Sequence, residues 1–282
     1  MAEKIRIEKN SVEETLIIPL YARVQCARLY KKLYSDPESE RALSRIDYDF
    51  SNVKSDGFAV KFGALEVAMR ESDVAFEITE YLKDHPKAAV CNLGCGLDPI
   101  ARNLDNGQCK IYNLDLPDVI EIRNAIFPAG PREKNIPYNL NDFSWFEQID
   151  ASGGAIFFAC GVFYYFHAED VKKLFCAMNE KFTGCRLVFD TAGKAALKAM
   201  IKGIVKDKAG IDDVDAYFHA GNPEKDIVPW SNGFKVSHRG YMLGYSDLRC
   251  ESVPRAFRLL SKFADEVMGM KIVRVEFGEE IV

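Results

Sequence analysis

The chain has 282 residues, 48% of them hydrophobic, and a formal net charge of −5 at pH 7. This length fits one large domain or two small ones, and the apolar fraction is sufficient to bury a substantial core. The acidic balance and the absence of a long basic block argue against a nucleic-acid partner, because a phosphate backbone requires a concentrated basic face. No apolar run is long enough for a membrane span, and the charged N-terminus lacks the apolar core of a signal peptide.

Eight cysteines are spread from Cys26 to Cys250, several of them inside apolar runs, and no CxxC pair occurs. A buried free cysteine behaves as a small hydrophobic side chain. A structural zinc ion needs four converging ligands, and the sequence shows no such set. We therefore expect a reduced, cytoplasmic protein with no metal site.

Helices are expected before the first strand of the sheet. Residues 11–35 indicate a helix interrupted near Pro19, and apolar residues recur near helical spacing from about Lys61 to Lys83. The segment Asp84–Pro86 ends this second helix, because the residue before a proline avoids the helical conformation. Together these helices predict an N-terminal helical lid or cap over residues 1–87.

Short apolar runs then alternate with helix-like segments. The runs read "AAVCNLG", "CKIYNLDL", "NIPYNLN", "GAIFFACGVFYYF", "CRLVFDTA", "FKVSHRGYMLGY" and "KIVRVEF". This alternation predicts an α/β domain over residues 88–282, with parallel strands joined by right-handed crossovers and buried on both faces. The last strand is expected to run antiparallel at one edge. A polar, glycine-dotted insertion is expected at about 193–233.

Two glycines one residue apart, Gly94 and Gly96, follow the first of these strands, and Asp115 ends the second. In an open parallel sheet, ligands bind beyond the carboxyl ends of the strands. Residues without a Cβ atom allow the backbone to approach a ligand closely there. A carboxylate at the end of the second strand can accept hydrogen bonds from both hydroxyls of a ribose. The pattern therefore indicates a cofactor that contains a nucleoside.

Pro99 stands three positions after the second glycine, where a dinucleotide fingerprint has a third glycine or an alanine. The loop "LGCGLD" is more typical of proteins that bind S-adenosylmethionine, which has no phosphate to hold. A nicotinamide-dependent oxidoreductase is the less favoured alternative.

The segments "ETLIIPLYARV", "RIDYDFS", "VCNLGCGLD", "YNLDLPDVIEIR", "NDFSW" and "ACGVFYYF" share one resemblance. Over roughly residues 12–192 the chain resembles the leucine carboxyl methyltransferase family, and most closely its bacterial branch of tetracenomycin-type polyketide O-methyltransferases. The resemblance implies a class I S-adenosylmethionine-dependent methyltransferase. Its fold would be a Rossmann-like, mostly parallel seven-stranded sheet with an antiparallel edge strand and extra N-terminal helices.

The resemblance also implies which residues bind the cofactor. The candidates from the glycine loop and the helix before it are Gly94, Cys95 and Gly96 at the methionine part and Arg70 at the cofactor carboxylate. The candidates for the ribose and the adenine are Asp115, Leu116, Asn139, Leu140 and Asp142. For Arg70 the alternative is a solvated charge on a helix. For Asp142 it is a helix N-cap, because an aspartate before "FSWF" suits that position equally well.

Cys160 is the main departure from the family pattern, which has a glutamate near the cofactor's ammonium group at this position. A neutral thiol does not pair with an ammonium group, so either cofactor affinity is reduced or another acid compensates. If affinity is reduced, the alternative to an enzyme is a degenerate methyltransferase that acts as a cofactor-binding or sensor protein. Replacing Cys160 with glutamate should then raise the affinity.

The expected acceptor is a small-molecule hydroxyl or carboxylate, with the C-terminal carboxylate of a protein as a lesser variant. A carboxylate is already nucleophilic, whereas a hydroxyl benefits from a general base. The weak candidates for that base are His167, His219 and His238. Candidates for the substrate pocket or lid are Tyr164 and Tyr165 after the fourth strand, and Tyr21 and Arg23 in the first helix, where helix packing is the alternative. The sequence predicts neither the acceptor nor the oligomeric state.

Overall fold

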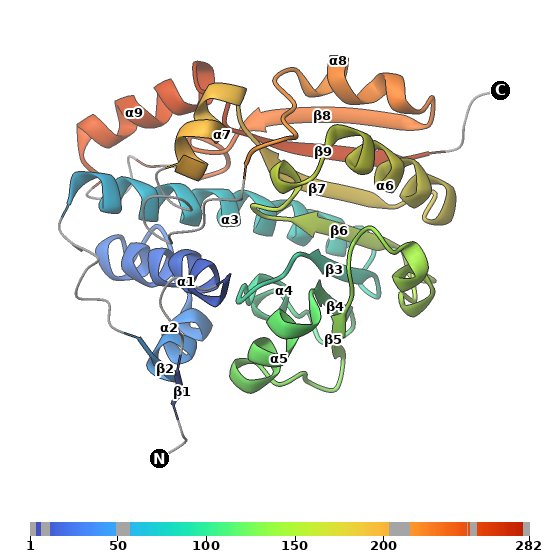
Figure 1. Ribbon diagram of the computed structural model, residues 1–282, viewed down its shortest axis with the longest axis horizontal. Helices are drawn as coiled ribbons and strands as arrows, with labels where there is room; N and C mark the ends of the chain where they lie inside the picture. The colour runs from blue at the N-terminus through green and yellow to red at the C-terminus, as the bar shows by residue number, and fades with distance from the viewer. Residues whose placement is uncertain are drawn as a thin grey trace.

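A computed structural model describes residues 4–6, 12–48, 57–202, 215–246, 248 and 253–278. Figure 1 shows a central twisted sheet with helices packed against it, and the first two helices of the chain lie at one end of the molecule. None of the helices in these ranges is both long and apolar enough to cross a bilayer. The seven cysteines that the structure describes are all free thiols.

The N-terminal part consists of the strand β1 (Ile5–Arg6), the helices α1 (Val12–Leu29) and α2 (Pro37–Ser44), the strand β2 (Ile46–Asp47) and the long helix α3 (Phe58–Asp84). The short strands β1 and β2 pair in parallel. Asp36 caps α2 by accepting a hydrogen bond from the Ser39 backbone N–H at 3.0 Å, and Pro37 occupies the first turn, where a missing N–H costs nothing.

Pro19 does not interrupt the first helix, contrary to the sequence prediction, because α1 runs through it. A proline inside a helix removes one backbone hydrogen bond. Burial of Ile17, Leu20 and Val24, each at most 1% exposed, offsets this loss because the apolar face of α1 is held against its neighbours. Helix α3 ends at Asp84, directly before "HP", as the sequence predicts.

The main sheet has seven strands in the order β5-β4-β3-β6-β7-β9-β8. Their bounds are β3 Ala89–Leu93, β4 Lys110–Asp115, β5 Glu133–Pro137, β6 Ala155–Ala159, β7 Arg186–Thr191, β8 Phe234–Gly240 and β9 Lys271–Phe277. Strands β3 to β7 are parallel, whereas β9 is antiparallel to both β7 and β8. The predicted α/β fold with a mostly parallel seven-stranded sheet is therefore confirmed. The antiparallel strand β9 is not itself the edge strand, because β8 pairs with it on the side away from β7.

The remaining helices connect the strands. They are α4 (Ile100–Asn103), α5 (Pro117–Ile126), η2 (Phe143–Gln148), η3 (Phe163–Tyr165), α6 (Ala168–Lys181), α7 (Lys194–Met200), α8 (Pro223–Ile227), η5 (Val228–Trp230) and α9 (Arg255–Glu266). In the central strands, alternate residues enter different cores. In β6, Ile156 and Phe158 pack with α3, whereas Phe157 and Ala159 pack with α6. Burial on both faces explains why these strands are continuous apolar runs in the sequence.

The division into a cap at 1–87 and an α/β domain at 88–282 stays a proposal. The first strand of the main sheet begins at Ala89. Helix α3, however, contributes Val74 and Ile78 to the same core as Ile156 of the sheet. The segment proposed as an insertion at 193–233 carries α7, α8 and η5 in its described parts.

Candidate cofactor site

The candidate site lies at the carboxyl edge of the parallel strands, where β3, β4, β6 and β7 end next to one another. The glycine loop, residues 94–96, follows β3 and is held by its neighbour β4. The backbone N–H groups of Gly94 and Cys95 both donate to the carbonyl oxygen of Leu114, at 2.8 and 3.0 Å. The loop therefore turns back over the end of β4, beside Asp115.

Gly94 and Gly96 both adopt positive φ angles, +67° and +45°, which side chains other than glycine rarely tolerate. Gly94 also lies in close contact with the segment that follows β6. A Cβ atom built on Gly94 would lie 2.6 Å from Cγ2 of Val162. The glycine is thus required by both its backbone angle and its neighbour.

Asp115 is hydrogen-bonded to the glycine loop. Its Oδ2 accepts from the Gly96 N–H at 2.7 Å, and its Oδ1 accepts from the Leu116 N–H at 2.8 Å. Burial raises the pKa of the Asp115 carboxyl, while these two hydrogen bonds and Arg123 oppose that rise. A carboxylate oxygen has two lone-pair directions, so each oxygen keeps an acceptor position for a ligand hydroxyl.

Arg123 of α5 forms hydrogen bonds to the backbone of the same loop. It was not among the candidates predicted from the sequence. Its side chain is 1% exposed, and Nη1 donates to the carbonyl oxygens of Gly96 and Asp98, both at 2.9 Å. Arg123 ends the segment "DLPDVIEIR". A charged residue on the apolar side of that short helix was the signal that could have identified it.

The residues proposed for the adenine follow β5. Tyr138 N–H donates to the Asp115 carbonyl at 2.8 Å, which places this segment beside the ribose candidate. Leu140 is buried, whereas Leu116 is exposed. The Asn139 side chain accepts from the Asn141 N–H at 3.0 Å. Asp142 accepts from the Ser144 N–H at 3.1 Å, so its carboxylate caps η2, and hydrogen bonds from Ser144 lower its pKa.

Cys160, at the end of β6, is partly buried and lies beside the buried ion pair of Arg70 and Asp190. The Arg70 Nη1 atom donates to Asp190 Oδ2 at 3.1 Å, and the Gly161 N–H donates to Asp190 Oδ1 at 2.6 Å. Burial raises the pKa of the Cys160 thiol well above its usual value, so this side chain is neutral. Asp190, at the end of β7, is a second residue that sequence reasoning missed.

Three tyrosines and a further carboxylate surround the Arg70 end of the site. Tyr164 and Tyr241 are buried, and Tyr165 is 40% exposed. The Tyr241 hydroxyl donates to Glu66 Oε1 at 3.5 Å. Burial raises the pKa of Glu66, and the positive charge of Arg70 opposes this rise.

Arg23 lies under the glycine loop and is only 4% exposed. Its Nη2 donates to the carbonyl oxygen of Leu97 at 2.7 Å, and its Nε lies 3.3 Å from Asp36 and 3.4 Å from Glu71. The side chain therefore joins α1, α2 and α3 to the loop, which is the helix-packing alternative. Tyr21, on the same helix, is partly buried.

The three histidines proposed as general bases lie on different segments of the structure. His167 is the N-cap residue of α6, and its ring centroid lies 4.2 Å from that of Tyr217. His238 on β8 pairs with Glu224 of α8 at 2.8 Å. His219 lies beside the end of β7, because the next residue, Ala220, donates its N–H to Thr191 Oγ1 at 3.0 Å. Its buried Nδ1 has no hydrogen-bond partner among the described residues.

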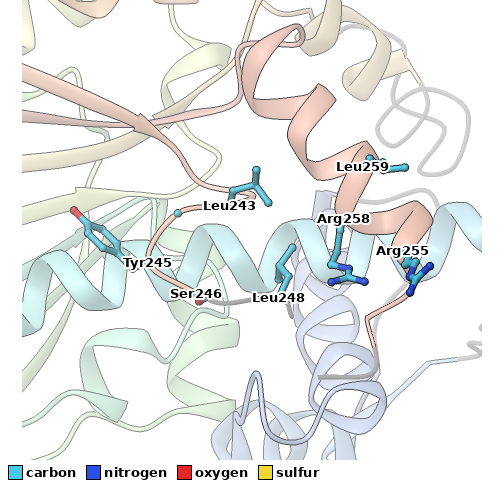
Figure 2. A pocket seen from close by; sticks show the side chains of 8 residues that line it. Leu243, Tyr245, Ser246, Leu248, Arg255, Arg258 and Leu259 are labelled. Atoms are coloured by element: carbon cyan, nitrogen blue, oxygen red, sulfur yellow. The ribbon is translucent and has the colours of Figure 1, made fainter. Parts of the chain in front are cut away.

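Within the described ranges, no three histidine, cysteine, aspartate or glutamate side chains are arranged to hold a metal ion. A cavity of about 680 Å³ lies elsewhere, along α3, between the segment after β8 and the first turn of α9. Figure 2 shows Leu243, Leu248 and Leu259 lining it, with Arg255 and Arg258 at one end. None of its lining residues is a candidate cofactor ligand.

The sheet order, the glycine loop and the aspartate that ends β4 define a class I methyltransferase fold. The family model described as leucine carboxyl methyltransferase matches residues 65–179. The resemblance to this family seen in the sequence is therefore confirmed over residues 65–179.

The proteins similar to the chain include two curated relatives and a solved structure. Tetracenomycin polyketide synthesis O-methyltransferase TcmP of Streptomyces glaucescens is 30% identical over 175 residues, which cover 62% of this chain and 63% of the relative. S-adenosyl-L-methionine-dependent methyltransferase dpfgK of Gibberella zeae is 29% identical over 146 residues, which cover 50% of this chain and 49% of the relative. The chain thus matches about half to two thirds of each relative's length.

The solved structure is a DUF574 family protein from Streptomyces avermitilis, with a TM-score of 0.56 and 11% identity. The superposition covers 91% of this chain and 96% of that protein. At this identity the likeness concerns the fold.

Proposed function

We propose that this protein is an S-adenosylmethionine-dependent methyltransferase that methylates an oxygen atom of a small molecule and releases S-adenosylhomocysteine. The observation that carries this proposal is the hydrogen bond at 2.7 Å from the Gly96 N–H to Asp115, which joins the glycine loop to the ribose candidate at the ligand-binding edge of the sheet. The family match over residues 65–179 and the two curated relatives support it.

The residues at this edge have the donors and acceptors that such a cofactor requires. Asp115 keeps acceptor positions for ribose hydroxyls, and the Arg70 Nε atom is buried without a hydrogen-bond partner among the described residues. An unpaired buried donor costs free energy, which a ligand carboxylate would relieve. The adenine ring would be bordered by Asn139, Leu140 and Asp142. The methionine part would lie against the glycine loop, residues 94–96.

The acceptor is an oxygen atom of a small-molecule hydroxyl or carboxylate, and the name of the relative TcmP, an O-methyltransferase, supports this choice. A carboxylate is already nucleophilic, whereas a hydroxyl must also lose a proton. In the reaction the acceptor oxygen bonds to the methyl carbon as the carbon–sulfur bond breaks, and the hydroxyl proton passes to a base. Two groups are proposed to accept it: Glu66, and the Nδ1 atom of His219, which has no hydrogen-bond partner among the described residues.

A methyltransferase-like protein that binds the cofactor without transferring its methyl group is the second candidate. The neutral Cys160 thiol, where the family has glutamate, favours it. The relatives' activities favour the enzyme, with a small-molecule acceptor such as the polyketide product implied by the name of TcmP.

Calorimetric titration with S-adenosylhomocysteine tests the proposed cofactor. We expect saturable binding below millimolar ligand, in the range usual for enzyme ligands, and no binding of NADH in a parallel titration. The absence of heat up to millimolar S-adenosylhomocysteine, or saturable binding of NADH instead, would reject the proposal.

A further inference from the structure

Resting on the proposed function, we propose that Asp190 binds the ammonium group of the cofactor's methionine part, and so replaces the acid that is missing at position 160. Asp190 is the last residue but one of β7, whereas position 160 directly follows the neighbouring strand β6. The negative charge is thereby supplied from the next strand of the sheet.

The position of the Asp190 carboxylate supports this role. The side chain is 6% exposed, and it reaches sideways to the loop after β6, where its Oδ1 accepts from the Gly161 N–H at 2.6 Å. Gly161 lies between Cys160 and Val162, and Val162 is the residue that contacts Gly94. The carboxylate is therefore anchored next to the segment that packs on the glycine loop.

Arg70 and Asp190 together match an amino-acid zwitterion. The pair presents one guanidinium and one carboxylate, 3.1 Å apart between Nη1 and Oδ2. The Arg70 Nε donor is unpartnered among the described residues, and each Asp190 oxygen uses one of its two lone-pair directions. Arg70 can thus bind the cofactor's carboxylate while Asp190 binds its ammonium group, through charge-assisted hydrogen bonds.

A purely structural ion pair is the alternative, because a buried arginine and aspartate can serve only to join α3 to β7. The two roles differ in which ligand they affect. S-adenosylhomocysteine carries the amino-acid part, whereas 5′-methylthioadenosine has the same adenosine and thioether without it. A structural role would change the binding of both ligands, whereas ammonium binding changes only the first.

The experiment is a calorimetric comparison of these two ligands with Asp190→Asn, which retains a side-chain oxygen for the Gly161 N–H. We expect S-adenosylhomocysteine to bind about tenfold to a hundredfold more weakly, as befits loss of a hydrogen bond between charged groups. We expect 5′-methylthioadenosine to bind as it does to the unchanged protein. The matched control is Glu77→Gln. Glu77 is another buried carboxylate, and it pairs with Arg186 and Arg274. It lies on α3 about two turns beyond Arg70, away from the proposed ammonium site. Both ligands should bind this control normally.

Cys160→Glu gives a second test that does not depend on the folding of Asp190→Asn. In the unchanged background it should not strengthen S-adenosylhomocysteine binding, because Asp190 already supplies the charge. In the Asp190→Asn background it should restore part of the lost affinity.

Unchanged S-adenosylhomocysteine affinity in Asp190→Asn, an equal loss for both ligands, or a sharp gain from Cys160→Glu alone would overturn the role of Asp190. Failure of the unchanged protein to bind S-adenosylhomocysteine would instead reject the proposed cofactor itself.

Discussion

Replacing Asp115 with alanine is expected to weaken the binding of S-adenosylhomocysteine about a hundredfold. Hydrogen bonds to a charged group contribute about 1.5–3 kcal/mol each, and about 2.7 kcal/mol corresponds to a hundredfold change in affinity. The variant would lose its contacts to the ribose hydroxyls and would also release the Gly96 N–H that the carboxylate now holds at 2.7 Å. Calorimetric titration measures the effect.

The same substitution should weaken the binding of 5′-methylthioadenosine to a similar degree, because that ligand retains the ribose. This separates Asp115 from Asp190, whose replacement should affect only the ligand with an amino-acid part. Asp118→Ala is the matched control, since Asp118 is an exposed carboxylate three residues further on. A folded Asp115→Ala variant with normal affinity would show that Asp115 does not bind the ribose.

Replacing Gly94 with alanine is expected to destabilise the protein and to reduce its cofactor affinity. The residue has φ of +67°, and left-handed backbone costs a residue with a side chain about 1–2 kcal/mol. The added Cβ atom would also lie 2.6 Å from Val162 Cγ2, and overpacking of this kind costs about 1–3 kcal/mol more. Urea unfolding measures the combined loss of stability.

Gly107→Ala separates the two contributions. Gly107 has φ of +80°, but a Cβ atom there meets nothing within 4 Å, so only the backbone cost applies. Adding Val162→Ala to Gly94→Ala should recover part of the stability by removing the clash. Equal stability of the Gly94 and Gly107 variants would contradict the account of close packing between the glycine loop and the segment after β6.

The sequence predicts the sheet well because its central strands are buried on both faces and leave continuous apolar runs separated by helices. It does not predict that β9 lies between β7 and β8, because the order of strands depends on pairing between distant segments. It also wrongly predicts an interruption at Pro19, where packing of Ile17, Leu20 and Val24 holds the helix together. Local rules fail where tertiary contacts decide the outcome.

The same distinction applies to the candidate site. Gly94, Gly96 and Asp115 are visible in the sequence because the glycines lie in the turn after one strand and Asp115 ends the next. In the structure the Gly96 N–H donates to Asp115, and the Gly94 N–H donates to the carbonyl oxygen of Leu114 beside it. The pairing of Arg70 with Asp190 spans 120 residues, and no local pattern marks it. The histidines carry no spacing that would place one of them beside the site, and in the structure His167, His219 and His238 lie on separate elements.

A crystal structure of the protein with S-adenosylhomocysteine tests the central claim most directly. We expect the ribose hydroxyls within hydrogen-bonding distance of the Asp115 carboxylate, with the methionine part passing the glycine loop toward Arg70 and Asp190. An adenosine bound elsewhere, or an Asp115 carboxylate turned away from the ribose, would contradict it.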